Sequence, residues 1–288
     1  MWLGHGLFQE LGWEDNLEAR LRLCRDLAMD IVFLPVTLSY PHNNLFDYRY
    51  FSLDDVSRLV TESHGLLVGA IIDGPFQQLS QKIGLRHLLH RWLTPGAIET
   101  LQEEATKVGQ LVSACLECKL DALVIADDIA YHHSTFVNPR DLEQCLFIFY
   151  RDWVQQAHNR GISVFFHSDG RLTDVLLALL ACGFDGLAGC QLEYLDLTAL
   201  PQQYKSRLVL LAGIPDDLLE KVELDSSHRK QFAELLTTLT SVGHLVLCSS
   251  CGLSSARHLY RLRMLHQLAD EARGNSSEVK RRYHALSN

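Results

Sequence analysis

The chain has 288 residues, of which 47% are hydrophobic and 21% charged, and its 26 basic against 35 acidic residues give a net charge of −9. This composition excludes a disordered chain, and the negative charge argues against nucleic acid as a partner because phosphate backbones would be repelled. No apolar run approaches the ~20 residues of a membrane-spanning helix, and eight scattered cysteines fit reduced thiols. We therefore expect a cytoplasmic protein without a membrane partner, in which residues 1–288 form one domain and 273–288 a mobile tail.

Seven short apolar runs predict strands, and amphipathic stretches between them predict helices. The runs cover residues 31–36, 66–72, 122–126, 163–166, 186–188, 208–211 and 245–247. Helices are expected to begin at Thr94-Pro95 and Asn138-Pro139, and a leucine stripe from Leu259 to Leu268 predicts the last one. Alternating strands and helices pair their strands in parallel, which indicates an α/β fold. We predict a single-domain (β/α)8 TIM barrel, whose eighth strand the sequence does not locate.

Four side chains at or just beyond predicted strand ends have the chemistry of metal ligands. They are His167, Asp169, Glu193 and Cys251. A parallel barrel gathers its carboxyl-terminal loops in one place, so these residues are expected to form one metal site. Residues two apart in an extended segment face the same way, and this allows His167 and Asp169 to share a target.

A second group of candidates surrounds this expected metal site. Asp127 and Asp128 follow the third strand, where acidic residues can bind a substrate amine, orient water or transfer protons. We assign Asp127, Asp128 and Tyr131 as catalytic residues. His132 is expected to bind substrate at the same mouth, and Gly74-Pro75-Phe76 to bind it by shaping the pocket floor.

Each candidate also has a structural alternative. His167 could cap a strand, Asp169 could hydrogen-bond the turn that it begins, and Glu193 could be a solvated carboxylate. Cys251 could be a small buried hydrophobic residue or a reactive thiol without metal. The two adjacent aspartates after the third strand could cap helices.

Several motifs together resemble the uroporphyrinogen decarboxylase superfamily. The passage from Ala126 to Gly170 carries Asp127-Asp128 and ends in His167-Ser168-Asp169-Gly170. Matches to other family segments occur in the family's order, at Ile72–Phe76, Leu192–Leu197 and Ser249–Leu253. The resemblance covers most of the chain from about Leu66 to Leu268, and it implies an (β/α)8 barrel.

The resemblance also implies a metal. The methyltransferase branch of this superfamily holds zinc with a His-x-Cys pair and a distant cysteine, which His167 and Cys251 match, and Glu193 matches a glutamate added in cobalamin-independent methionine synthase. Asp169 stands where the paired cysteine would be. A carboxylate in place of a thiolate makes the site harder, so zinc or another divalent transition metal is expected.

From this resemblance we expect a metal-dependent methyltransferase that passes a methyl group between a corrinoid or similar donor and a thiol or hydroxyl acceptor. A separate corrinoid protein would then be a partner. Association of two copies into a homodimer is an alternative that the sequence leaves open. One alternative is a decarboxylase of uroporphyrinogen or a related carboxylate substrate, with protonation assisted by Asp127, Asp128 or Tyr131. A second alternative is a noncatalytic tetrapyrrole-binding protein.

Overall fold

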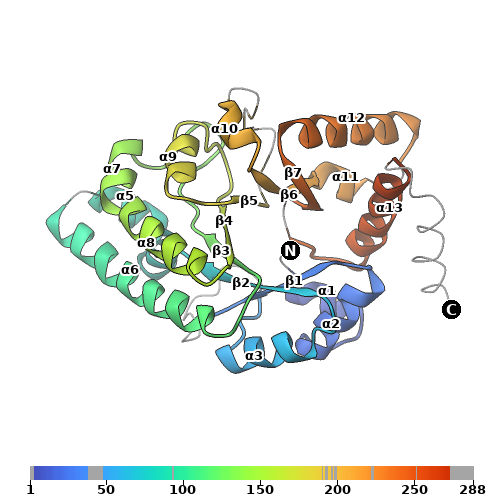
Figure 1. Cartoon of the computed structure of the whole chain (residues 1–288), viewed down its shortest axis with the longest axis horizontal. Coiled ribbons are helices and arrows are strands. Elements are labelled where there is room, and N and C mark those ends of the chain that lie inside the picture. The colour runs from blue at the N-terminus through green and yellow to red at the C-terminus, as the bar shows by residue number, and fades with distance from the viewer. Residues whose placement is uncertain are drawn as a thin grey trace.

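Seven parallel strands form one curled sheet in chain order (Figure 1). The computed structural model describes residues 3–37, 48–92, 94–189, 191, 194–195, 197, 200–221, 224–250 and 252–272. The strands are β1 Ile31–Pro35, β2 Leu67–Asp73, β3 Ala122–Ala126, β4 Ser163–His167, β5 Gly186–Ala188, β6 Val209–Ile214 and β7 His244–Ser249. The seven predicted strands are confirmed, since each begins at the residue that the sequence indicates or next to it.

Helices connect the strands and cover the outside of the sheet (Figure 1). They are α1 His5–Glu10, α2 Leu17–Asp26, α3 Leu53–Glu62, α4 Pro75–Ile83, α5 Leu85–Arg91, α6 Pro95–Leu116, α7 Pro139–Cys145, α8 Phe147–His158, α9 Leu176–Ala181, α10 Gln202–Lys205, α11 Asp216–Glu220, α12 Ser226–Val242 and α13 Ala256–Ala272. The helix starts predicted at the two proline motifs are confirmed, and Asn138 accepts a hydrogen bond from the Arg140 amide. The helix expected to begin at Asn138-Pro139 is divided into α7 and α8 at Leu146, where φ is −122° and ψ is −48°.

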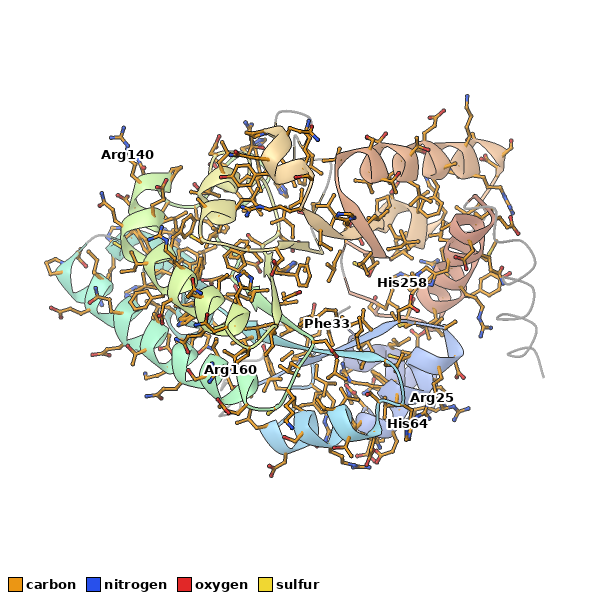
Figure 2. All side chains as sticks on the ribbon, viewed as in Figure 1. Arg25, Phe33, His64, Arg140, Arg160 and His258 are labelled. Atoms are coloured by element: carbon orange, nitrogen blue, oxygen red, sulfur yellow. The ribbon has the colours of Figure 1, made fainter. Side chains whose placement is uncertain are left out.

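Side-chain alternation along the strands divides the core into two layers. In β3, Leu123 and Ile125 belong to the outer cluster that packs under the helices. Val124 and Ala126 belong instead to the inner cluster on the concave face of the sheet. Phe33 of β1 is part of the same inner cluster and lies near the middle of the molecule, whereas Arg140 lies at its periphery (Figure 2). Residues of one parity therefore face the inside of the curled sheet.

The curled sheet is open within the described part of the chain. β7 pairs with β6, no ladder joins β7 to β1 among the described residues, and one parallel bridge links Leu3 to Leu253. Val246 in β7 is 39% exposed. The predicted α/β class and parallel sheet are confirmed, while an eighth strand and full barrel closure are not seen in the described segments.

No helix of the described residues has both the length and the apolar character that crossing a membrane requires. The tail predicted over residues 273–288 lies outside the described residues.

Candidate functional site

A pocket opens at the carboxyl ends of the strands, and all seven strands contribute to its wall. Its cavity volume is about 100 Å³. The inner-face parity continues into this pocket, because Ile71 and Phe165 of the inner cluster are followed two residues later by Asp73 and His167, which line the wall. The polar lining residues include Tyr48, Asp73, Gln77, Asp128, His167, Asp169, Ser249 and Ser250.

His167 ends β4 and has a defined imidazole orientation. Its Nδ1 lies 2.7 Å from the carbonyl oxygen of Ala188 in β5. A carbonyl can only accept, so Nδ1 carries the proton of this hydrogen bond and Nε2 is directed elsewhere. Nε2 lies 3.9 Å from Oδ1 of Asp128. A backbone carbonyl behind Nδ1 is the arrangement that orients imidazoles bound to metals in proteins.

The loops after β3 and β4 are joined by Asp128. Its Oδ1 accepts a hydrogen bond of 3.0 Å from the Asp169 amide. Next to it Gly170 has φ +84°, and a Cβ there would lie 2.6 Å from the backbone of Tyr131, so glycine permits the close approach of the two loops. Asp128 is thus near both members of the predicted His-x-Asp pair, and Asp169 itself is an exposed residue of the pocket lining.

Asp127 does not line the pocket, although it precedes Asp128 directly. Its carboxylate is buried and accepts hydrogen bonds from the amides of Phe76 and Gln77 at the start of α4 and from the Tyr150 hydroxyl. Burial raises the pKa of Asp127 to about 7. This geometry corresponds to the helix-capping alternative, so the structure places Asp127 as a link between β3 and α4 rather than at a reacting group.

Gly74-Pro75-Phe76 forms the turn that receives this carboxylate. Gly74 precedes the first residue of α4, and a Cβ on it would lie 2.2 Å from the Asp127 Cγ. Phe76 is buried. The next residue, Gln77, lines the pocket. The predicted substrate-binding turn therefore lies behind the pocket wall and positions α4.

Asp73 is the site residue that the sequence analysis did not single out. It ends β2, lines the pocket, and accepts a hydrogen bond of 2.5 Å from the Tyr50 hydroxyl. Burial raises the pKa of Asp73 to about 6. Strand parity was the available signal, since Ile71 faces the inside of the sheet and a residue two positions later points the same way.

Tyr131 and His132 lie on the loop after β3, outside the pocket lining. The Tyr131 side chain is 41% exposed and stacks on Phe136 with ring centroids 5.5 Å apart. The His132 ring lies 5.5 Å from the Tyr194 ring. His133 contacts the rings of both Tyr131 and His132. These rings form an exposed aromatic group beside the site, so Tyr131 is not positioned to act on a group inside the pocket.

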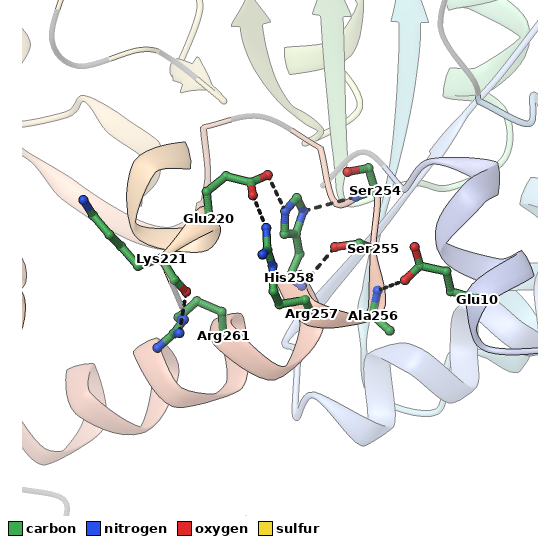
Figure 3. A network of polar contacts seen from close by, with 9 residues as sticks. All are labelled: Glu10, Glu220, Lys221, Ser254, Ser255, Ala256, Arg257, His258 and Arg261. Carbon is green, nitrogen blue, oxygen red and sulfur yellow. Dashed lines mark hydrogen bonds and ion pairs between the residues drawn. The ribbon is translucent and has the colours of Figure 1, made fainter. Parts of the chain in front are cut away.

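The last loop of the site, after β7, is fixed by a polar network (Figure 3). His258 of α13 accepts a hydrogen bond from the Ser254 amide at Nδ1, and its Nε2 lies 2.7 Å from Glu220 of α11. Glu10 of α1 caps the start of α13 by accepting a 2.8 Å bond from the Ala256 amide. Ser250 and Gly252, which precede this network, line the pocket.

The described residues supply only part of the predicted metal-ligand set. Glu193 and Cys251 lie outside them, and no three donors from His, Cys, Asp or Glu converge in the described part of the chain. The oriented His167 and the carboxylates of Asp128 and Asp169 fit a divalent transition ion in donor type, because imidazole nitrogen and carboxylate oxygen are both zinc ligands.

Comparisons with known proteins identify the fold alone. No family model matches the chain, and no curated protein matches it. A methyltransferase from Methanosarcina mazei has a TM-score of 0.70 at 15% identity, covering 93% of this chain and 92% of that one. A B12-independent methionine synthase from a Shewanella species has a TM-score of 0.57 at 12% identity, covering 91% and 87%. An L-ribulose 3-epimerase has a TM-score of 0.54 at 12% identity, covering 96% and 95%.

These similar structures are mostly enzymes of different reaction types. They share with this chain a parallel α/β architecture, in which loops follow the carboxyl ends of the strands. The likeness therefore shows the fold and no particular activity, and any reaction has to be argued from the pocket.

Proposed function

We propose that this protein is a methyltransferase that moves a methyl group between a corrinoid or similar donor and a thiol or hydroxyl acceptor bound in the strand-end pocket. The observation that carries the proposal is the His167 imidazole, whose proton is held on Nδ1 by Ala188 so that Nε2 faces the pocket carboxylate of Asp128. The resemblance to the uroporphyrinogen decarboxylase superfamily and the fold of the Methanosarcina mazei methyltransferase support it.

In this proposal His167, Asp169, Glu193 and Cys251 hold a divalent transition ion, with zinc as the first choice. When bound, such an ion lowers the pKa of a thiol or hydroxyl. His167 contributes a lone pair at Nε2, and the carbonyl of Ala188 prevents the ring from turning away. The exchange of a cysteine for Asp169 reduces the thiolate content of the set and makes it more tolerant of metals other than zinc.

Asp128 is the residue that we assign to the acceptor's proton. Its Oδ1 lies 3.9 Å from His167 Nε2, and Asp128 lines the pocket in which we propose that the acceptor binds. In the transfer, the acceptor's S–H or O–H bond gives its proton to this carboxylate, and a bond forms between the acceptor atom and the methyl carbon. The donor keeps the electron pair of the bond that breaks.

Decarboxylation of uroporphyrinogen is less well supported by the pocket. A substrate with many carboxylates requires several cationic side chains close together. The described lining contains no lysine or arginine and has three aspartates, which would repel such a substrate.

The proposal is tested by metal content and methyl transfer in matched variants. Elemental analysis of purified wild-type protein should give about one equivalent of a transition metal, and His167→Ala should lose most of it. His87→Ala, which changes an exposed histidine on α5, is the control and should keep it. With methylcobalamin as donor and a small thiol as acceptor, wild type and the control should methylate the thiol. A metal-free wild-type protein, or a His167→Ala variant with full transfer activity, would rule the proposal out.

A further inference from the structure

A second cavity, the amino-end cavity, opens at the amino-terminal ends of the strands. Its volume is about 360 Å³. The first residues of β1 to β4 line it, together with four residues of β7 and part of the second half of α13. Phe33, Leu211 and Cys248 line both this cavity and the strand-end pocket, so they form the layer between the two. The inside of the curled sheet is therefore filled in its middle and open at its amino-terminal end.

Two apolar side chains in this opening are exposed although they have the parity of the inner face. Leu67 in β2 lies four residues before Ile71 of the inner cluster and is 51% exposed. Val246 in β7 lies two residues before Cys248, which packs against the same cluster, and is 39% exposed. In a closed barrel such residues are packed in layers. The opening therefore favours an occupant that brings apolar side chains to cover them.

The rim of the amino-end cavity carries negative charge. Asp30 and Asp121 are exposed there, and Asp270 is half-buried. No lysine or arginine of the described residues lines the cavity. Burial lowers the pKa of His266 in the same lining, so its imidazole is neutral at pH 7 and does not offset the carboxylates. An occupant with basic side chains is therefore favoured over a neutral or acidic one.

The chain itself continues from the wall of this cavity. α13 contributes Asp270 to the wall and ends at Ala272, after which residues 273–288 follow. They include four basic side chains against one acidic, and the run from Val279 to Tyr283 combines positive charge with apolar side chains. An extended chain spans at most about 3.3–3.6 Å per residue, so position 280 can lie up to about 26 Å from the end of α13. A tethered segment with this reach has an effective concentration of about millimolar, an advantage over any free partner.

We propose that residues 279–286 of the same chain bind across the amino-end cavity instead of remaining a mobile tail. The basic run 280–282 then faces the carboxylates of the rim, and the apolar side chains on both sides of that run cover the exposed apolar surface of the opening. The contacts are made by side chains and add no backbone pairing to β7. This binding does not depend on the proposed methyl transfer, because it concerns the opposite end of the strands.

The test is cleavage by chymotrypsin after Tyr283 in the intact native protein, followed by mass spectrometry. A protease cuts a bound segment only when it is released, so wild type should be cut at least about tenfold more slowly than a synthetic peptide of residues 273–288. Asp30→Lys/Asp270→Lys changes the rim without changing the cleaved sequence, and it should raise the rate about fivefold. The control Glu99→Lys/Glu103→Lys makes the same change of charge on the exposed side of α6 and should leave the rate unchanged.

Charge reversal on the tail gives the complementary measurement. Lys280→Glu/Arg281→Glu/Arg282→Glu should be cut as fast as the peptide of its own sequence, and combining it with the rim variant should restore slow cleavage. If the rim variant does not fold by circular dichroism, the tail variant decides, since it changes only residues that follow α13.

A wild-type rate equal to that of the free peptide would overturn the inference, because the cavity would then be open to another partner. Slow cleavage that the rim variant and the tail variant both leave intact would overturn it too. Slow cleavage that is lost on dilution would mean that the tail of a second copy is the occupant, which also contradicts binding within one chain.

Discussion

Two adjacent aspartates at the end of β3 have different surroundings because successive side chains of a strand face opposite sides. Asp127 continues the parity of Leu123 and Ile125 and reaches the amides that begin α4. Asp128 continues the parity of the inner face and enters the pocket. A shift of one residue along the strand thus decides whether a carboxylate links two elements of the fold or faces the pocket.

The buried carboxylate of Asp127 makes stability depend on pH. Burial raises the pKa of Asp127 from 3.8 to about 7, so between these values the native state binds more protons than the unfolded state. The free energy of unfolding therefore falls as pH rises through this window, by at most about 1.4 kcal/mol per pH unit for one group. Asp127→Asn should remove the fall between pH 6 and 7, as measured by urea unfolding at several pH values.

Asp73→Asn provides the matched control for this measurement. The pKa of Asp73 is raised only to about 6, so its contribution ends below the window that is diagnostic for Asp127. The control should keep the fall between pH 6 and 7. If Asp127→Asn shows the wild-type slope there, the protonation of Asp127 assigned here is incorrect.

The close approach of Gly74 to Asp127 gives a second prediction at a single residue. In Gly74→Ala the new Cβ would lie 2.2 Å from the Asp127 Cγ, so the turn and the carboxylate have to separate. Overpacking of this kind costs about 1–3 kcal/mol. Gly96→Ala is the control, because nothing lies within 4 Å of a Cβ there and alanine favours helix α6 by up to about 1 kcal/mol. Urea unfolding in which both variants lose the same stability would contradict the steric explanation.

The sequence was most informative about the positions of the strands and helices. Apolar runs located the strands because strands of a parallel sheet are buried on both faces and contain few polar residues. The division between α7 and α8 at Leu146 was not predictable, since the apolar spacing continues through it. The roles of Asp73 and Asp127 depend on partners that are distant in the chain, Tyr50 and the start of α4, and the two motifs in which these aspartates occur do not reveal those partners.

Helix α3 allows a test of capping within one element. The Ser52 hydroxyl accepts a hydrogen bond from the Asp55 amide, and the Asp55 carboxylate accepts one from the Ser52 amide. Ser52→Ala should therefore cost about 1 kcal/mol. The same substitution at Ser57, exposed in the middle of the helix, should gain about 0.5 kcal/mol from helix propensity. Thermal unfolding that shifts both variants in the same direction would contradict the capping role.

At the scale of the whole molecule, the sheet has a protected middle and an exposed edge. β3 is buried at every residue and pairs with β2 and β4, while β7 pairs with β6 and carries two exposed residues. Amides of β7 should exchange with deuterium much faster than those of β3 in a native-state experiment. Equal protection would mean that another segment or another molecule covers the outer edge of β7.

The proposed metal site would bring together donors that are up to 84 positions apart in the chain, from His167 to Cys251. The measurement that tests this most directly is the absorption spectrum of cobalt(II)-substituted protein. Wild type should show a thiolate-to-cobalt charge-transfer band, which Cys251→Ser should abolish. Cys248→Ser should retain it, because burial raises the pKa of Cys248 to about 11 and keeps this thiol protonated. A band that survives Cys251→Ser, or cobalt that stays bound after His167→Ala, would contradict the proposed gathering of these donors around one ion.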